Sequence, residues 1–346
     1  MVGARSPSEG EVTRDLNRHV VVITGASSGI GRLTALDFAR QGAHVIAAAR
    51  NIRALRRLEE AAASMSGSIT AVEADVTSSA DLHAAAATAV AQHGRIDTWV
   101  NGAGVAIWAT VEQTDPEEVR RVLEVNVLGV VHGTLAALEV MSSRDQGTII
   151  NIGSVESMRA MPLQSAYAAS KHAVKGFTEA LRAELEHEKR SINLVLVMPS
   201  AINTPIFRHA RSRLGGVMPR PHTPVYDPKV VSDAILAAAQ NPVPRVIVGG
   251  AGAGLVLLQR VSPWLADRAL SLTGWTGQIS DRPDDGADNL DGPLDEAGEV
   301  RGDYGAGARQ VSWYTRISGL HPAATRIALA GALFIGALMV SRRRGQ

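Results

Sequence analysis

A tyrosine and a lysine stand four positions apart in the stretch SAYAASKHA, as Tyr167 and Lys171. On a helix this spacing puts both side chains on one face. A phenol titrates near ~10, so it is a poor base at neutral pH, but an adjacent ammonium is expected to lower that pKa. A tyrosine tuned in this way can exchange a proton with an alcohol or carbonyl oxygen. The spacing alone is equally typical of an ordinary surface pair, so the residues around it must show whether Tyr167 and Lys171 are catalytic.

Two other polar residues stand where they can join this pair. Ser154 follows the apolar run GTIINI, at the carboxyl end of an expected strand, and its hydroxyl can hold a substrate oxygen. Asn126 lies inside an expected helix, a position that disfavours asparagine. It is either a buried amide with satisfied hydrogen bonds or a member of the site.

The stretch TGASSGIG, residues 24–31, is typical of a phosphate-binding turn between a strand and a helix. Gly25 permits the tight turn, Gly29 allows close approach of a pyrophosphate, and Gly31 allows the helix to pack on the strand. The G-x-x-x-G-x-G spacing differs from the common dinucleotide fingerprint. The other expected cofactor contacts in this loop are Ser27, Ser28 and Ile30.

The end of the second expected strand indicates which dinucleotide binds. An NAD site favours a carboxylate about 20 residues after the glycines, to bond the ribose hydroxyls. Here Ala49 fills that position and Arg50 follows, so a guanidinium is available for a 2′-phosphate. The sequence therefore predicts NADP(H) in preference to NAD(H), the alternative being that Arg50 is an ordinary surface residue.

Strand and helix patterns alternate around these residues. Continuous apolar runs, typical of strands covered on both faces, stand at 19–24, 43–49, 68–74, 96–101, 147–154, 192–198 and 245–249. Helical patterns lie between them, the longest at 115–141 and 164–188. This alternation predicts an α/β fold with a doubly wound, Rossmann-type, mainly parallel sheet of seven strands.

Composition excludes several classes of function. The chain has 346 residues, a net charge of +1 and no cysteine. It therefore has no disulfide, thiolate metal site or cysteine nucleophile, and no overall charge that favours nucleic acid. No metal site is predicted.

The chain resembles the short-chain dehydrogenase/reductase family over roughly residues 19–250. The resemblance rests on TGASSGIG, Asp75-Val76, NGAG at 101–104, Asn126, Ser154, YAASK and MPSAINT at 198–204, in the family's order. Two small residues depart from the family pattern, Gly102 in NGAG and Ser200 after Pro199. Neither change removes a reacting group.

The resemblance implies a role for each matching position. Tyr167 would be the general acid/base, Lys171 would lower its pKa and bond the nicotinamide ribose, and Ser154 would polarise the substrate oxygen. Asn126 would hold a water in a proton relay. The remaining implied cofactor contacts are Asp75, Val76, Asn101, Ala103, Gly104, Pro199, Ile202 and Thr204. The reaction implied is hydride transfer between a nicotinamide and a carbonyl or secondary alcohol.

The segment after Thr204, residues 205–228, corresponds to the family's substrate lid. Its apolar groups, with Val155, Met158 and Met161 nearby, favour a lipophilic substrate. A non-catalytic nucleotide-binding regulator or scaffold on the same fold is the alternative, although the usual mark of such a protein would be loss of Ser, Tyr or Lys. An epimerase or dehydratase is less consistent with the glycine spacing.

The expected organisation has five parts. They are a flexible lead-in (1–17), the catalytic domain (18–250), an amphipathic helical extension (251–280), a flexible acidic and Gly-rich linker (281–315) and an apolar helix with a basic end (316–346). The last part predicts membrane contact through residues 323–344, or else packing on protein. The other expectations are a cytoplasmic protein and a homodimer or homotetramer through the two long helices.

Overall fold

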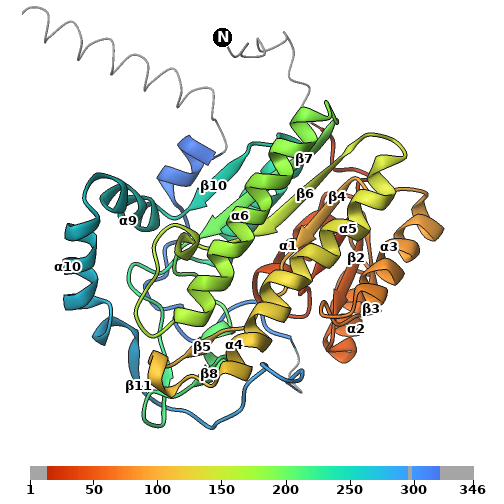
Figure 1. Cartoon of the computed structure of the whole chain (residues 1–346). Helices are drawn as coiled ribbons and strands as arrows, with labels where there is room; N and C mark the ends of the chain where they lie inside the picture. Colours follow the sequence, from red (N-terminus) through yellow and green to blue (C-terminus); the bar gives the residue numbers. More distant parts are fainter. Residues whose placement is uncertain (1–13, 295–297, 320–346) are drawn as a thin grey trace, which may run out of the picture.

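The centre of the molecule is a parallel sheet of seven strands in the order β10-β7-β6-β4-β1-β2-β3 (Figure 1). The computed structural model describes residues 14–294 and 298–319. The strands are β1 Val20–Thr24, β2 His44–Ala49, β3 Ser68–Glu73, β4 Thr98–Asn101, β6 Gly147–Ile152, β7 Ile192–Pro199 and β10 Arg245–Val248. All seven coincide with the predicted apolar runs, so the predicted fold class is confirmed.

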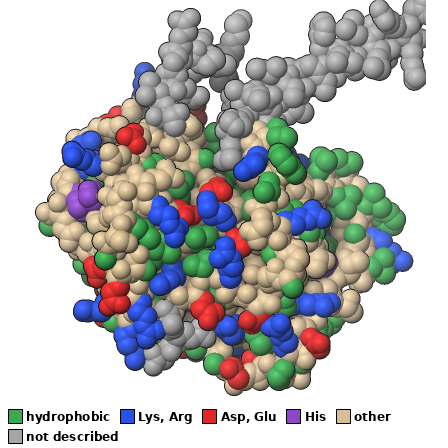
Figure 2. Space-filling view, turned by 180° about the vertical axis from the view of Figure 1, so that it is seen from behind, with side chains coloured by type: hydrophobic (Ala, Val, Ile, Leu, Met, Phe, Trp, Pro, Cys, Tyr) green, Lys and Arg blue, Asp and Glu red, His purple; other side chains and the backbone are tan. Residues whose placement is uncertain are grey.

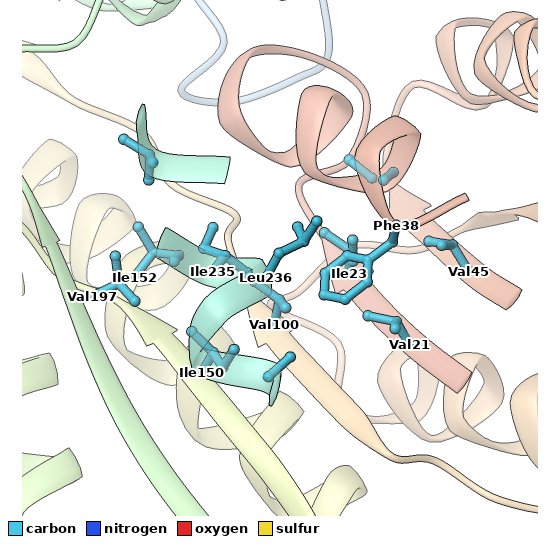
Figure 3. Close-up of a cluster of buried hydrophobic side chains, with 14 of the residues drawn as sticks. Val21, Ile23, Phe38, Val45, Val100, Ile150, Ile152, Val197, Ile235 and Leu236 are labelled. Carbon is cyan, nitrogen blue, oxygen red and sulfur yellow. The ribbon is translucent and has the colours of Figure 1, made fainter. Parts of the chain in front are cut away.

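Helices cover both faces of this sheet. On one face lie α1 (Gly29–Arg40), α2 (Ile52–Ala61) and α8 (Pro228–Gln240), and on the other lie α3 (Ser79–His93), α5 (Gly129–Ser142) and α6 (Ser165–His187). Alternate residues of β1 enter the two cores: Val21 and Ile23 pack with Phe38 of α1 (Figure 3), and Val20 and Val22 pack on the opposite side. Burial on both faces explains why the strands are apolar throughout.

The helix expected at 115–141 is interrupted. It consists of α4 (Pro116–Leu123), a π-helical turn at Glu124–Leu128, and α5. A cap begins α4, because Asp115 accepts a hydrogen bond from the Glu117 N–H and Pro116 is the first helical residue. In the described part of the chain, Pro116–Ser142 is the one helical stretch long and apolar enough to cross a membrane, but half of its apolar window is buried, as in a core helix.

The chain after β10 forms a helical hairpin, α9 (Gly250–Val261) and α10 (Pro263–Thr273). The break between the two helices falls at Pro263, where the Ser262 hydroxyl accepts a hydrogen bond from the Leu265 N–H. After α10, β11 (Ile279–Pro283) pairs with β9 (Val217–Pro219). The short elements are β5 Ile107–Trp108, α7 Ile206–His209, β8 Arg211–Ser212, the 3₁₀ turns Val111–Gln113, Val155–Ser157 and Thr276–Gln278, and a π turn η5 at Thr315–Gly319.

The segment predicted as a flexible linker, 281–315, lies instead on the catalytic domain wherever it is described. Leu290 is 1% exposed and joins the core beneath α3 and α5. Arg211 forms ion pairs with Asp288 at 2.8 Å and with Asp291 at 2.7 Å, and Arg301 forms one with Asp227 at 2.6 Å. One anchored apolar side chain and several ion pairs therefore order a stretch whose composition is typical of disorder. The predictions for residues 1–13 and 320–346 lie outside the described residues.

Candidate active site

Two adjoining cavities lie along the carboxyl ends of the central strands. The first, about 200 Å³, is bounded by the loop between β1 and α1. The second, about 390 Å³, is bounded by the ends of β6 and β7 and by α6. Ile30, Gly104 and Thr204 line both, so a ligand that fills one cavity reaches the other. An open parallel sheet binds ligands at this edge, where its strand order reverses.

The glycine loop gives the first cavity its shape. Gly25 has φ +72°, and a Cβ there would lie 2.7 Å from the backbone of Ala103. A Cβ at Gly31 would lie 2.4 Å from the carbonyl oxygen of Gly25. Both positions therefore need glycine. Of the cofactor residues expected from the sequence, those that line this cavity are Gly25, Ser27, Ser28, Ile30, Gly31, Arg50, Asp75, Val76, Ala103, Gly104 and Thr204.

Gly29 and Asn101 are absent from both linings. The Gly29 N–H donates to the carbonyl of Glu299 at 2.7 Å. The Asn101 side chain accepts from the indole of Trp99 at 2.8 Å and donates to Asn151 at 2.8 Å. Asn101 therefore ties β4 to β6 behind the cavity, and its side chain, implied by the resemblance to contact the cofactor, does not line the cofactor cavity.

Arg50 and Asp75 both line the first cavity, and their opposite charges interact. One Arg50 nitrogen, Nη2, donates to the carbonyl of Asn289 at 2.7 Å, and the other, Nη1, is buried without a hydrogen-bond partner. Burial would raise the pKa of Asp75, but hydrogen bonds from Thr77 and the charges of Arg50 and Arg121 hold that pKa below its usual value. A cationic nitrogen is thus left available to an anionic ligand.

One wall of the first cavity comes from residues that the sequence analysis missed. We call residues 284–294 and 298–304 the C-terminal strap. Its Asn289, Pro293, Leu294 and Gly298 line the cavity, and Asn51 donates to the carbonyl of Leu294 at 2.8 Å. A signal was present in the sequence, since Leu290 and Leu294 are large apolar residues among aspartates and glycines.

Tyr167, Lys171 and Ser154 meet on the wall of the second cavity. The Lys171 Nζ lies 5.4 Å from the centre of the Tyr167 ring and donates to the carbonyl of Ile152 at 2.9 Å. Tyr167 and Ser154 share a hydrogen bond. The helical spacing and the strand end therefore bring together the three residues that the sequence singled out.

The expected lowering of the Tyr167 pKa by Lys171 is not found. Burial and the nearby Glu156 raise the pKa of Tyr167, although the hydrogen bond with Ser154 opposes them. Burial also lowers the pKa of Lys171 to about 8, against the attraction of Glu156. The prediction was wrong for this state because it did not include the cost of removing both groups from water.

Glu156 is a second residue that the sequence analysis missed. It is 6% exposed, lines the second cavity and accepts a hydrogen bond from the Met161 N–H, while its Oε2 has no partner. Burial raises the pKa of its carboxyl to about 8, against the charge of Lys171. Glu156 stands two positions after Ser154, so the sequence indicates that it lies near the end of β6, but the sequence does not indicate that its carboxyl is buried.

Asn126 lies in the π turn between α4 and α5, a distortion frequent at functional sites. Its amide donates to the Val105 carbonyl at 2.9 Å and to the Ser170 hydroxyl at 3.0 Å, and its oxygen accepts from the Val105 N–H at 2.8 Å. This is the satisfied buried amide that the sequence left as one alternative. The relay role stays a prediction.

The rest of the second cavity is formed by three segments. Pro199 is the last residue of β7, and Ile202 and Thr204 follow it; all three line this cavity. The expected lid supplies Ile206, Phe207 and residues 220–224. The hairpin α9–α10 supplies Ala251, Gly252, Leu255, Ala269, Leu270 and Thr273. Met158, expected near the substrate, packs instead beside Val174 and Met198.

Metal binding has no candidate site in residues 14–294 and 298–319, where no group of three or more His, Asp or Glu side chains could hold an ion.

Comparison with known proteins gives the family. The model described as "short chain dehydrogenase" matches residues 19–215. The Bacillus subtilis "Uncharacterized oxidoreductase YxnA" is 36% identical over 88% of this chain and 86% of its own length. The Bos taurus "Dehydrogenase/reductase SDR family member 7B" is 34% identical over 73% of this chain and 80% of its own. A Burkholderia phymatum short chain dehydrogenase/reductase, solved in complex with NAD, superposes with a TM-score of 0.65 at 25% identity, covering 73% of this chain and 96% of that one. The chain belongs to the short-chain dehydrogenase/reductase family and is an oxidoreductase of CH–OH or C=O groups that acts by hydride transfer with a nicotinamide cofactor.

Proposed function

We propose that this protein is an NADP(H)-dependent dehydrogenase/reductase of a lipophilic carbonyl or secondary alcohol. The observation that carries the proposal is the convergence of Ser154, Tyr167 and Lys171 on a cavity that adjoins the one bounded by the glycine loop. Ser154 caps the 3₁₀ turn at Val155–Ser157, and Tyr167 and Lys171 come from α6, so rigid elements hold all three side chains.

The first cavity fits a phosphorylated dinucleotide. Gly25 and Gly31 leave room for a pyrophosphate at the start of α1. The buried, unpartnered Arg50 Nη1 supports a 2′-phosphate beside it, and Ala49 brings no opposing carboxylate. Ser28 and Asn51 line the same end. The Burkholderia phymatum structure contains NAD, so NAD(H) is the alternative cofactor.

The side chains of the second cavity can supply the proton that the substrate oxygen takes up when a carbonyl is reduced. When bound, the nicotinamide supplies or accepts the hydride. The phenol of Tyr167 is protonated at neutral pH, as a phenol with an ordinary pKa near ~10 already is and as burial, which raises this pKa further, reinforces. In the reducing direction it can therefore give its proton to the carbonyl oxygen. Ser154, which already bonds Tyr167, would hold that oxygen in place. Lys171 would donate a hydrogen bond to the nicotinamide ribose and keep the phenol of Tyr167 oriented.

The walls of the second cavity support a lipophilic substrate. Trp108, Met161, Phe207, Leu255 and Leu270 line it, with few charged groups besides Glu156, Lys171 and Arg220. Such a wall favours apolar groups on either side of the reacting carbon.

A homodimer or homotetramer is part of the proposal. Leu128 and Leu135, on one face of the π turn and α5, are 48% and 52% exposed, which supports pairing of these helices between subunits. Sedimentation of the purified protein would give its mass.

Two variants test the proposal. Tyr167→Phe should reduce turnover of a ketone by about 10³-fold while leaving NADPH affinity nearly unchanged, as measured by cofactor fluorescence. Arg50→Ala should weaken NADPH binding by at least about tenfold and leave NADH binding alone. Turnover near that of the unmodified protein in the first variant, or unchanged NADPH affinity in the second, would refute the corresponding role.

A further inference from the structure

Exposed apolar side chains gather on one side of the molecule. Of the fourteen large hydrophobic side chains exposed in the described chain, ten belong to α9, to α10 and the turn that follows it, and to the stretch around η5. We call these ten the apolar patch. They are Leu257, Val261, Trp264, Leu265, Leu272, Trp275, Val311, Trp313, Tyr314 and Ile317. Figure 2 shows hydrophobic side chains massed at this edge, on the right of that view.

The hairpin is apolar on two sides. Its inner side buries Val256, Ala266 and Leu270, and Gly252 is docked so closely that a Cβ would lie 2.4 Å from Val155. Its outer side carries Leu257 and Val261 on one helix and Leu265 and Leu272 on the other, at helical spacing. A helix that faced only water would be polar on its outer side.

Three of the five tryptophans of the chain belong to the apolar patch. Trp264 and Trp313 are each 70% exposed and Trp275 is 47% exposed, whereas Trp99 and Trp108 are buried. Tryptophan favours the boundary between lipid and water, because its large apolar ring carries one polar N–H. This distribution indicates an interface with lipid headgroups.

Charge at the apolar patch is mainly basic. Between residues 251 and 275 the charged side chains are Arg260, Asp267 and Arg268, and Asp267 is paired with Arg159 at 2.6 Å. Arg316 lies over the ring of Trp313, with 5.8 Å between the guanidinium carbon and the ring centre. Apolar side chains bordered by arginines fit the surface of an anionic bilayer.

The chain continues from the apolar patch into an apolar sequence. Ile317 belongs to the patch, and the next residues, 320–346, include the apolar run Ile327–Val340 followed by Arg342, Arg343 and Arg344. A bilayer that received this run would be tied to the patch by the short stretch of chain between Ile317 and Ile327. This continuity favours lipid over a second protein as the occupant of the patch.

The opposite side of the hairpin lines the second cavity, where Leu255 and Leu270 face the space that holds Tyr167. We propose that the apolar patch docks the protein on an anionic lipid bilayer and that the hairpin α9–α10 forms the passage by which a lipophilic substrate moves from the bilayer into the cavity. The docking surface is independent of the reaction, whereas the passage rests on the proposed function.

Fluorescence of the full-length protein tests the docking surface. Vesicles of phosphatidylcholine and phosphatidylglycerol, with and without brominated acyl chains, would be mixed with the protein and with the variant Trp264→Phe/Trp275→Phe/Trp313→Phe. We expect bromine to quench the unmodified protein and to leave the variant, which retains Trp99 and Trp108, unquenched. Failure to float with the vesicles, or flotation without quenching, would overturn the docking surface. Dissociation of a lipid-free dimer by Trp264→Gln/Leu272→Gln, without quenching in the unmodified protein, would assign the patch to a second copy and also overturn it.

Kinetics test the passage. A long-chain methyl ketone held in the same vesicles and a short, water-soluble methyl ketone would be compared with NADPH as reductant. Trp264→Gln/Leu272→Gln should raise the KM for the vesicle-borne ketone by about tenfold, the loss expected for about 1.4 kcal/mol of apolar contact, and should leave the KM for the soluble ketone unchanged. The matched control is Val90→Gln/Val111→Gln, which changes two exposed valines outside the patch.

Equal KM values for the vesicle-borne ketone in the two double variants would overturn the passage. Absence of turnover of either ketone by the unmodified protein would instead count against the proposed function, and the quenching result would still stand. The two failures are therefore distinguishable.

Discussion

Glu156→Gln should remove a large pH dependence from the stability of this protein. The carboxyl of Glu156 has a pKa of about 8 in the folded protein, because it is buried, and an ordinary value of 4.5 when the chain is unfolded. Between these values the folded state keeps a proton that the unfolded state releases. The free energy of unfolding therefore falls as the pH rises from 4.5 to about 8 and is independent of this group at higher pH. Glutamine is neutral in both states and shows no such fall.

The magnitude follows from the two pKa values. At 1.36 kcal/mol for each pH unit, the difference between 4.5 and about 8 amounts to about 5 kcal/mol as an upper bound. Urea unfolding of both proteins between about pH 5 and about pH 7.5 would measure it. This range stays below the pKa of about 8 of Lys171, whose titration is coupled to that of Glu156.

We expect the stability of the glutamine variant relative to the unmodified protein to increase by about 1 kcal/mol or more for each pH unit in this range. Glu59→Gln, which changes an exposed glutamate on α2, is the control and should show a constant difference. Parallel profiles for Glu156→Gln and the unmodified protein would refute the argument, since they would mean that Glu156 is ionised in the folded state.

Three further outcomes follow from the site. Gly25→Ala should weaken NADPH binding by at least about tenfold, because a Cβ there would lie 2.7 Å from Ala103. Gly94→Ala, at a similar φ with no atom within 4 Å of the added Cβ, is the control and should only lower the free energy of unfolding by about 1 kcal/mol. Equal NADPH affinities in the two variants would contradict the close approach at Gly25. Asn101→Ala should lower the free energy of unfolding by about 3 kcal/mol, because the hydrogen bonds to Trp99 and Asn151 are lost, and should leave NADPH affinity unchanged. Unchanged stability in denaturation together with weakened NADPH binding in cofactor titration would instead place this side chain on the cofactor. Arg211→Gln, which breaks the ion pairs to Asp288 and Asp291, should weaken NADPH binding several-fold by loosening the C-terminal strap, while Arg260→Gln on α9 should not; unchanged affinity would show that Arg211 is dispensable for holding the strap.

The sheet and the catalytic residues could be predicted because their signals are local. A strand buried on both faces has to be apolar along its length, and Tyr167 and Lys171 are brought together by helical spacing alone. Ser154 follows from the position at which its strand ends. The break between α9 and α10 follows from the geometry of Pro263.

The features that escaped prediction depend on contacts distant in sequence. The π turn centres on Asn126, whose partner Val105 lies 21 residues away. The C-terminal strap is ordered by Arg211 and by the burial of Leu290, in a stretch whose composition alone predicts disorder. The raised pKa of Tyr167 reflects burial, which no residue pattern around it reports.

The walls of the two cavities come from separate parts of the chain. The match to the family ends at residue 215 and contains Ser154, Tyr167 and Lys171. The hairpin α9–α10 and the C-terminal strap, which close the substrate and nucleotide ends, come after it. The reacting groups thus lie in one stretch of the chain, whereas part of the wall of each cavity lies in another, and selection can alter that part without disturbing the reacting groups. Exchange of the last third of the chain between relatives would therefore be a direct route to new substrates with the chemistry retained.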